Sequence, residues 1–223
     1  MNETNRATAR EIANQYLSKG DALGWFEELY AQANGDASII PWADLIPNPN
    51  LAAWLDKHKI RGEGRKALKI GCGLGDDAEE LARRGFDTTA FDISPSAIAW
   101  CKRRFPETSV LYVIADLFIA PGNWRSAFDF VLEAYTLQVL PMSFRQKAVE
   151  KIASFIKPGG TLLVIARARE RTEEEGRMPW PLTREDVNGF KSCGLMEKSF
   201  EDYMDNEEPR VRRFRIVYEK KIE

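Results

Sequence analysis

Cysteine and histidine are scarce in this chain of 223 residues, which has three cysteines and one histidine. Cys72, Cys101 and Cys193 are far apart and odd in number, which favours a reduced, cytoplasmic protein over a disulfide framework. No CxxC pair is present, so we expect no metal site. His58, distant in sequence from every motif below, is expected at a surface or helix end rather than as a catalytic base.

An excess of positive charge is lacking too, since 32 Lys and Arg stand against 34 Asp and Glu, a net charge of −2. Binding to nucleic-acid phosphates normally requires a clear cationic excess, so no nucleic-acid partner is expected. Basic clusters occur at residues 83–84, 102–104 and 210–215, each with acidic neighbours. We interpret them as solvated faces.

No apolar run approaches the roughly 18 residues that a membrane span requires. The first 20 residues are polar and hold no apolar core of a signal peptide. We therefore expect a soluble protein in the cytoplasm, without a membrane partner, as a monomer or homodimer.

The first third of the sequence has helical periodicity interrupted by a proline-rich loop. A helix is predicted over residues 6–17, a second begins after Asp21, and a third has Asn50 as its N-cap. Residues 1–60 are expected to form a helical cap within the same domain as a core of residues 61–223.

From Lys66 onward, short apolar runs alternate with helical segments, as in βαβ units of a parallel sheet. The tail instead holds two strand-like stretches, 196–203 and 211–219, joined by a polar turn, and these must pair as an antiparallel hairpin. The predicted core strands are 67–70, 88–91, 110–114, 128–133 and 161–166. The predicted core helices are 77–84, 95–105 (N-cap Ser94), 144–155 and one that begins with a Thr183–Asp186 capping box and ends at Gly194.

A glycine-rich loop follows the first of these strands, with Gly71, Gly73 and Gly75 leading directly into a helix. Glycine is required where the backbone turns sharply or lies against a ligand. A tight turn without a ligand remains the alternative, because such a loop alone is weak evidence.

Carboxylates at the ends of the next two strands strengthen the ligand hypothesis. Asp92 follows the loop by about 20 residues, where an acidic side chain accepts hydrogen bonds from ribose hydroxyls. Asp116 ends the third strand and is placed to receive an adenine amino group. Ligands of open α/β sheets bind at these carboxyl ends, so the three features predict one nucleoside site.

Asp76 helps to discriminate between nucleoside ligands. The dinucleotide fingerprint has glycine or alanine at this position, and a carboxylate here would face a pyrophosphate. A cationic sulfonium ligand without phosphate tolerates this charge, so the sequence favours an adenosylmethionine site over a nicotinamide site.

At this point the residues resemble a known family, the class I S-adenosylmethionine-dependent methyltransferases. The resemblance is carried in order by Ile70-Gly71-Cys72-Gly73-Leu74-Gly75, Phe91-Asp92-Ile93-Ser94, Ala115-Asp116-Leu117, Asp129-Phe130-Val131-Leu132-Glu133 and Lys157-Pro158-Gly159-Gly160. It implies a Rossmann-like, doubly wound, seven-stranded, mostly parallel sheet with a C-terminal antiparallel hairpin. It also implies S-adenosyl-L-methionine as cofactor, with S-adenosyl-L-homocysteine as product.

The same resemblance implies a set of cofactor-binding residues. They are Gly71, Gly73, Gly75, Asp77, Asp92, Ile93, Asp116, Leu117, Glu133 and Trp42. Lys69 departs from the family, which usually has Asp or Glu there, and this puts the support of the loop in question.

The N-terminal segment adds a finer match, because Gly24-Trp25, Pro41-Trp42 and Pro47-Asn48-Pro49 resemble the thiopurine, thiol and thiocyanate methyltransferase branch. The branch implies that Trp25 lines the acceptor site, and Tyr135, Gln138 and Trp180 are further candidates for acceptor binding. Tyr135, just past the fourth predicted strand, is the candidate for orienting methyl transfer, with a cation–π contribution. Ordinary packing is the alternative for each aromatic residue.

The expected function is therefore methylation of a small-molecule acceptor, with a thiol or another soft nucleophile as the leading class. No Asn/Asp-Pro-Pro-Tyr motif of amino-methylating enzymes is present, and an already nucleophilic acceptor needs only alignment and desolvation. Methylation of RNA or protein, an inactive cofactor-binding partner protein, and a nicotinamide-dependent oxidoreductase remain as alternatives.

Overall fold

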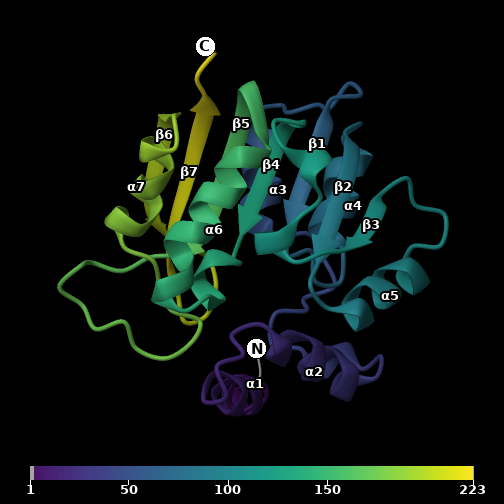
Figure 1. Ribbon diagram of the computed structural model, residues 1–223, viewed down its shortest axis with the longest axis vertical. Helices are drawn as coiled ribbons and strands as arrows, with labels where there is room; N and C mark the ends of the chain where they lie inside the picture. Colours follow the sequence, from purple (N-terminus) through teal and green to yellow (C-terminus); the bar gives the residue numbers. More distant parts are fainter. Residues whose placement is uncertain (1–2, 223) are drawn as a thin grey trace.

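A seven-stranded sheet forms the centre of the computed structural model, which describes residues 3–222 (Figure 1). The strand order is β3-β2-β1-β4-β5-β7-β6. All neighbours pair in parallel except β7, which is antiparallel to both β5 and β6. The strands are β1 (Lys66–Ile70), β2 (Asp87–Asp92), β3 (Leu111–Ile114), β4 (Phe128–Ala134), β5 (Ile156–Arg167), β6 (Leu195–Met204) and β7 (Arg212–Lys220). The predicted α/β fold with its C-terminal hairpin is confirmed.

Helices cover both faces of this sheet. They are α1 (Glu3–Leu17), α2 (Gly24–Ala33), α3 (Pro49–Lys57), α4 (Asp76–Arg83), α5 (Pro95–Arg104), α6 (Met142–Phe155) and α7 (Arg184–Ser192). Alternate residues along each strand face opposite sides, so each side chain is assigned to one helical layer. Leu162 and Val164 of β5 pack with α6 and α7, whereas Leu163 and Ile165 pack with α3 and α4.

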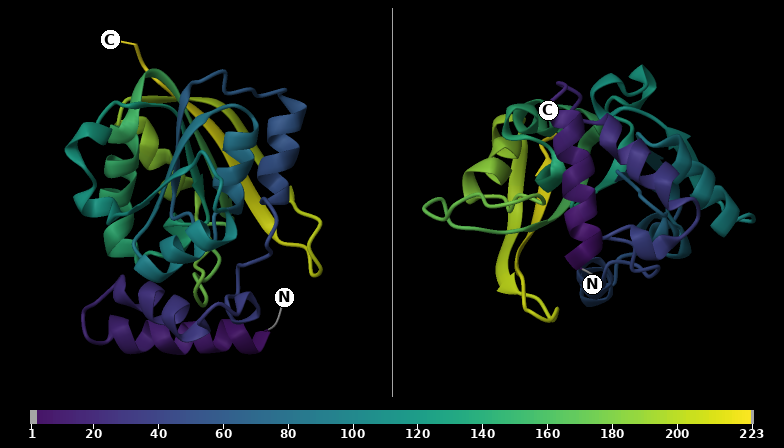
Figure 2. Two further views of the ribbon diagram at one scale, coloured as in Figure 1. Left: turned by 90° about the vertical axis from the view of Figure 1, so that its right-hand side faces the viewer. Right: turned by 90° about the horizontal axis from the view of Figure 1, so that it is seen from below.

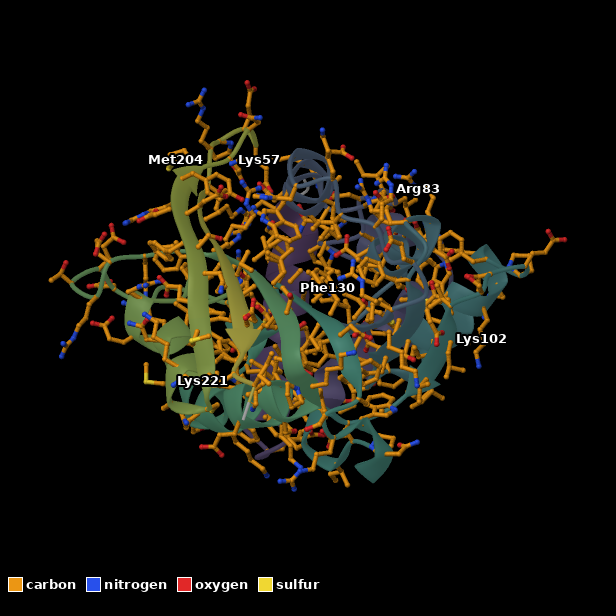
Figure 3. The ribbon with its side chains drawn as sticks, turned by 90° about the horizontal axis from the view of Figure 1, so that it is seen from above. Lys57, Arg83, Lys102, Phe130, Met204 and Lys221 are labelled. Carbon is orange, nitrogen blue, oxygen red and sulfur yellow. The ribbon has the colours of Figure 1, made fainter. Side chains whose placement is uncertain are left out.

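The charged residues lie mainly outside these apolar layers. Seen from above, Phe130 of β4 lies near the centre of the molecule, and Arg83, Lys102 and Lys221 lie toward its periphery (Figure 3). Among residues 3–222, no helix combines the length and apolar character needed to cross a membrane.

Helix starts follow the capping chemistry read from the sequence, with two corrections. The N-cap of α2 is Leu23 rather than Asp21, whose carboxylate accepts from the amides of Leu23 and Gly24 at 3.1 and 2.8 Å. The Ser94 hydroxyl accepts a 2.9 Å hydrogen bond from the Ala97 amide, and the Thr183–Asp186 capping box is complete. The N-cap of α3 is Asn48 rather than Asn50: its side chain accepts from the Asn50 amide at 2.9 Å. The reason is Pro49, whose fixed φ suits the first helical position, so the helix begins at Pro49, earlier in the sequence than predicted.

Strand β5 begins earlier than predicted, at Ile156 instead of Thr161. Ile156 pairs with Phe128 of β4, and the register then shifts before Phe130 pairs with Thr161. The Pro-Gly-Gly segment that follows α6 is therefore an irregular start of the strand rather than a separate turn.

Helices α1 and α2 lie at the end of the sheet where the parallel strands finish, beneath the strands in Figures 1 and 2. Glu27 of α2 fastens this pair to the core, because its carboxylate accepts hydrogen bonds from Ser94 at 2.6 Å and from the hydroxyl of Ser96 at 2.7 Å. The hydrogen bonds hold the pKa of Glu27 below its ordinary value, against the effect of burial. The division into a cap of residues 1–60 and a core of residues 61–223 stays a prediction.

Candidate active site

A cavity of about 930 Å³ opens at the carboxyl end of the parallel strands. Its volume is at the upper end of the roughly 300–1,000 Å³ typical of small-molecule sites, which gives room for two ligands side by side. Its walls come from α1, α2, the loop before α3, the ends of β1, β2, β4 and β5, and the β6–β7 turn. Of the predicted site residues, the cavity is lined by Trp42, Gly71, Gly73, Asp77, Asp92, Ile93, Asp116, Leu117, Tyr135 and Gln138.

The glycine loop contributes Gly71 and Gly73 to this cavity but not Gly75. Gly75 has a φ of 95°, and a Cβ there would lie 2.4 Å from the Tyr112 hydroxyl. Gly75 is therefore required by packing between the loop and β3. Gly71 and Gly73 line the cavity, but a Cβ on either would also meet the protein, at 2.7 Å from the Thr136 hydroxyl and 3.1 Å from the Tyr30 hydroxyl.

Asp92 joins the second strand to the glycine loop. One carboxylate oxygen accepts from the Gly73 amide at 2.9 Å, and the other accepts from the Ser94 amide at 3.1 Å. Burial raises the pKa of Asp92, and these two amides together with the charge of Lys69 oppose that rise. Because each oxygen has a second lone pair, the carboxylate can still accept hydrogen bonds from a ligand in the cavity.

Asp116 and Leu117 line the cavity just beyond the end of β3. The Asp116 carboxylate accepts a 2.7 Å hydrogen bond from the Phe118 amide, which begins the short helix η2 (Leu117–Ile119). Leu117 is buried in the core on one side and lines the cavity on the other. The pair thus offers a carboxylate and an apolar surface next to each other, which suits a planar heterocycle with amino groups.

Lys69 is buried, with 3% of its surface exposed, and its side chain supports the loop from behind. The ammonium donates to the carbonyl oxygens of Ile70 at 2.8 Å and Gly71 at 3.3 Å, and lies 4.0 Å from the Asp77 carboxylate. Asp77 in turn accepts from the Asn48 amide at 2.8 Å. The cation therefore replaces the family's acid with direct bonds to loop carbonyls, so the departure at this position leaves the loop supported.

The charge of Asp76 is already compensated by the protein. Its two carboxylate oxygens accept hydrogen bonds from Arg104 at 2.8 and 2.7 Å. Arg104 therefore screens the charge of Asp76 from a ligand, and this charge discriminates less against a pyrophosphate than the sequence predicts.

Glu133, at the end of β4, is completely buried and does not line the cavity. One oxygen accepts from the amides of Thr136 and Leu137 at 2.8 and 2.9 Å, and the other has no hydrogen-bond partner among residues 3–222. Burial raises the pKa of Glu133 to about 7, although these amides and Lys69 oppose the rise. Its place is under the loop that presents Tyr135.

Tyr135 itself adopts a φ of 66°, an uncommon value for a bulky residue. Its amide donates to the Ile165 carbonyl at 3.0 Å, and its ring lies 4.8 Å from the Arg213 guanidinium. Burial raises the pKa of Tyr135, so the phenol is protonated at neutral pH. A strained backbone that is fixed from several sides is characteristic of functional positions.

Asn50 and Tyr203 are cavity residues that the sequence did not reveal as functional. The Asn50 side chain donates to the Tyr135 hydroxyl at 3.2 Å and accepts from the Tyr203 hydroxyl at 2.9 Å. This chain of three polar groups joins α3, the end of β4 and the end of β6. No local sequence pattern marks it, because the residues are separated by 85 and 153 positions.

The tryptophans differ in their relation to the cavity. Trp42 lines it and donates to the Tyr30 hydroxyl at 2.8 Å. Trp25 is 1% exposed and stacks on Phe26 at 3.9 Å, so it supports the wall from within the core. Trp180 also stands behind the wall, where it packs against the cluster formed by α1 and α2.

Gln138 links the wall to the end of β5. Its side-chain oxygen accepts from the Arg167 amide at 2.7 Å, and its carbonyl accepts from the Trp180 amide at 2.7 Å. Gln138 is buried and lines the cavity. It therefore fixes the backbone of Arg167 relative to the loop before α7.

The interpretation of the basic clusters as solvated faces is wrong for several members. Arg213 is 1% exposed and bonds Asp205 at 2.7 Å, because the β6–β7 turn folds back over it. Arg84 is buried beside Glu80, and Arg215 lines the cavity. In each case a carboxylate compensates the charge, from 4 positions away for Glu80 and Arg84 to 14 positions away for Glu201 and Arg215.

Among the described residues, no group of three or more His, Cys, Asp or Glu side chains is arranged to hold a metal ion.

The amino-acid sequence is similar to those of known methyltransferases. A family model described as a methyltransferase domain matches residues 67–160. A ubiquinone biosynthesis O-methyltransferase of Xanthomonas campestris is 30% identical over 168 residues, which cover 74% of this chain and 65% of that protein. A thiopurine S-methyltransferase of Legionella pneumophila is 22% identical over 167 residues, covering 67% of this chain and 74% of its own. The chain thus spans about two thirds of the length of the Xanthomonas relative.

Solved structures share the fold. The 1,6-didemethyltoxoflavin-N1-methyltransferase of Burkholderia thailandensis has a TM-score of 0.69 at 16% identity, covering 94% of this chain and 91% of its own. A TehB-like methyltransferase of Corynebacterium glutamicum has a TM-score of 0.63 at 20% identity, covering 88% and 98%. The matched domain contains the glycine loop, Asp92 and Asp116, which line the cavity. Residues 67–160 thus match a methyltransferase domain, and the chain is similar to methyltransferases in sequence and to S-adenosylmethionine-dependent methyltransferases of known structure in fold.

Proposed function

We propose that the protein transfers a methyl group from S-adenosyl-L-methionine to a small-molecule acceptor. One observation carries the proposal: the glycine loop, Asp92 and Asp116 line a single cavity that continues past Tyr135 to the β6–β7 turn. A donor bound at the first part would therefore have open space beside it for an acceptor. The relatives support this, since those compared above are named for methylating small molecules.

The cavity residues fit the donor. The backbone at Gly71 and Gly73 would take the methionine portion, Asp92 the ribose hydroxyls, and Asp116 with Leu117 the adenine. Trp42 and Ile93 would close over the nucleoside. When bound, the donor supplies an activated methyl group, so the protein's own contribution is to align the acceptor and exclude water.

Tyr135 would orient the acceptor rather than deprotonate it. Burial keeps its phenol protonated at neutral pH, and its ring is held against Arg213. Glu133 is shielded below the loop and does not reach the cavity. A thiol or another soft nucleophile, which needs little assistance from a base, is therefore the acceptor class that we propose first.

The remaining features of the proposal follow the sequence. We propose a cytoplasmic enzyme, a monomer or homodimer, with residues 1–60 as a cap over the core of residues 61–223. We propose no nucleic-acid or membrane partner, because the net charge is −2 and Arg84, Arg104 and Arg213 of the basic clusters are paired with carboxylates.

Calorimetry with S-adenosylmethionine, S-adenosylhomocysteine and NAD tests the donor, and binding of NAD alone would contradict the proposal. A radiolabelled-methyl screen over thiols, halides, phenols and amines tests the acceptor, with bulk RNA and protein included. Transfer to RNA or protein but to no small molecule would favour the macromolecular alternative. Donor binding without transfer to any acceptor would favour an inactive binding protein.

A further inference from the structure

Five arginines line the cavity, and four of them have compensating partners. Arg6 and Arg10 are near Glu3, Arg213 bonds Asp205 and Glu207, and Arg215 bonds Glu201. The fifth, Arg167, has no hydrogen bond or ion pair from its guanidinium to any residue in 3–222. Its backbone is nevertheless fixed, because its amide donates to Gln138.

The position of Arg167 makes this lack of a partner costly. It is the last residue of β5 and stands directly opposite Arg213 of β7 in the antiparallel ladder. Side chains of directly opposed residues are close neighbours on one face of the sheet, and like charges there repel. The charge of Arg213 is compensated by the carboxylates of Asp205 and Glu207. Arg167 is half-buried and keeps its full charge without an ion-pair partner.

Arg167 lies at the acceptor end of the cavity. Its neighbour in the ladder, Arg213, covers the Tyr135 ring, and Tyr135 follows the strand adjacent to β5. Burial, Arg213 and Arg6 lower the pKa of Arg167, and the charge of Glu207 together with Tyr135 opposes this only in part. The donor-side carboxylates Asp92 and Asp116 lie instead at the ends of β2 and β3.

On the basis of the proposed function, we propose that Arg167 binds a carboxylate on the methyl acceptor and thereby selects carboxylate-bearing substrates. A guanidinium matches a carboxylate with two parallel hydrogen bonds, which fixes orientation as well as charge. A single carboxylate would balance the single uncompensated arginine. A phosphate dianion would bring a second charge close to Asp205 and Glu207, so we assign the group as a carboxylate.

Matched acid and methyl-ester pairs test this assignment. The probes are 4-mercaptobenzoate, 4-hydroxybenzoate and 4-aminobenzoate, each beside its methyl ester, titrated into protein saturated with S-adenosylhomocysteine. At least one acid should bind about 10- to 100-fold more tightly than its ester in the natural protein. Arg167→Gln should abolish this preference, and Arg167→Lys should retain part of it. Arg171→Gln, on an exposed loop, is the control and should leave it unchanged.

Two results would overturn the inference: no acid preferred over its ester in the natural protein, or an unchanged preference in Arg167→Gln. Tighter binding of phenylphosphonate than of every carboxylate would overturn the carboxylate assignment. S-adenosylhomocysteine affinity is measured on the same samples and should be equal in all four proteins. If the natural protein does not bind S-adenosylhomocysteine, the proposed function itself is refuted. If only Arg167→Gln fails to bind it, Arg167 contacts the donor rather than the acceptor.

Discussion

Asp92 accepts a 2.9 Å hydrogen bond from the backbone amide of Gly73, so the second strand holds the glycine loop by a side chain that also lines the cavity. A change at Asp92 is therefore expected to have two effects: the glycine loop is held less firmly, and a contact with the ligand is lost.

For Asp92→Ala we expect at least a 10-fold loss of S-adenosylhomocysteine affinity, since charge-assisted hydrogen bonds contribute about 1.5–3 kcal/mol. Asp92→Asn keeps an acceptor oxygen and should lose less. Asp87→Ala, exposed at the opposite end of the same strand, is the control and should bind normally in calorimetry. Equal affinity of Asp92→Ala and the natural protein would remove Asp92 from the donor site.

Glu133 makes stability depend on pH. The pKa of Glu133 in the folded protein, about 7, lies above the ordinary value of 4.5. The contribution of Glu133 to the free energy of unfolding is therefore fully present below pH 4.5 and is lost as the pH rises through 7. Glu133→Gln removes this dependence, and the variant should gain roughly 3 kcal/mol relative to the natural protein between pH 4.5 and pH 8.

Urea unfolding at several pH values measures this difference, with Glu107→Gln on the surface as the control. A stability difference between Glu133→Gln and the natural protein that stays constant with pH would contradict the raised pKa.

Lys69→Met should destabilise the protein by about 3–5 kcal/mol at neutral pH, because it leaves buried carboxylates without their cation. The charge of Lys69 lowers the pKa values of Asp77, Asp92 and Glu133 in the folded protein. Its removal lets those pKa values rise, so the loss of stability should be larger at pH 8 than at pH 5.

Denaturation at both pH values provides the measurement for Lys69→Met. Addition of Glu133→Gln should recover part of the loss at pH 8. A loss of equal size at both pH values would show that packing, rather than charge, explains the effect.

Gly75→Ala should lower stability by about 1–3 kcal/mol, because the new Cβ would lie 2.4 Å from the Tyr112 hydroxyl. Gly35→Ala is a matched control, with a φ of 92° against 95° and no atom within 4 Å of its Cβ. The difference between the two Tm values isolates the steric contact from backbone strain. Equal losses in the two variants would exclude a steric role for Tyr112.

The sequence predicted well which residues gather at the carboxyl ends of β1, β2 and β3, because its signals are local. Strand, glycine loop and helix follow one another within residues 66–83, Asp92 ends β2, and Asp116 follows the end of β3 by two residues. Parallel pairing then brings these carboxyl ends to one edge of the sheet.

The rest of the cavity could not be read in the same way, since its residues come from distant segments. Asn50, Arg167 and Tyr203 line one cavity although they come from α3, β5 and β6, and the Tyr203–Asn50 hydrogen bond joins residues 153 positions apart. The charge of Asp76 was misjudged for a related reason: its partner Arg104 is 28 positions away. Ion pairs of this kind depend on tertiary packing and leave no periodic pattern.

The antiparallel strand β7 has an evolutionary consequence. Because it reverses direction, the β6–β7 turn reaches the same edge as the glycine loop while remaining outside the matched domain of residues 67–160. Arg167, Tyr203 and Arg213 also lie outside that domain. Under the proposed function, mutations in this hairpin would therefore change which acceptor is recognised while the donor-binding residues of the matched domain stay intact, so new specificities would arise at one edge of the fold.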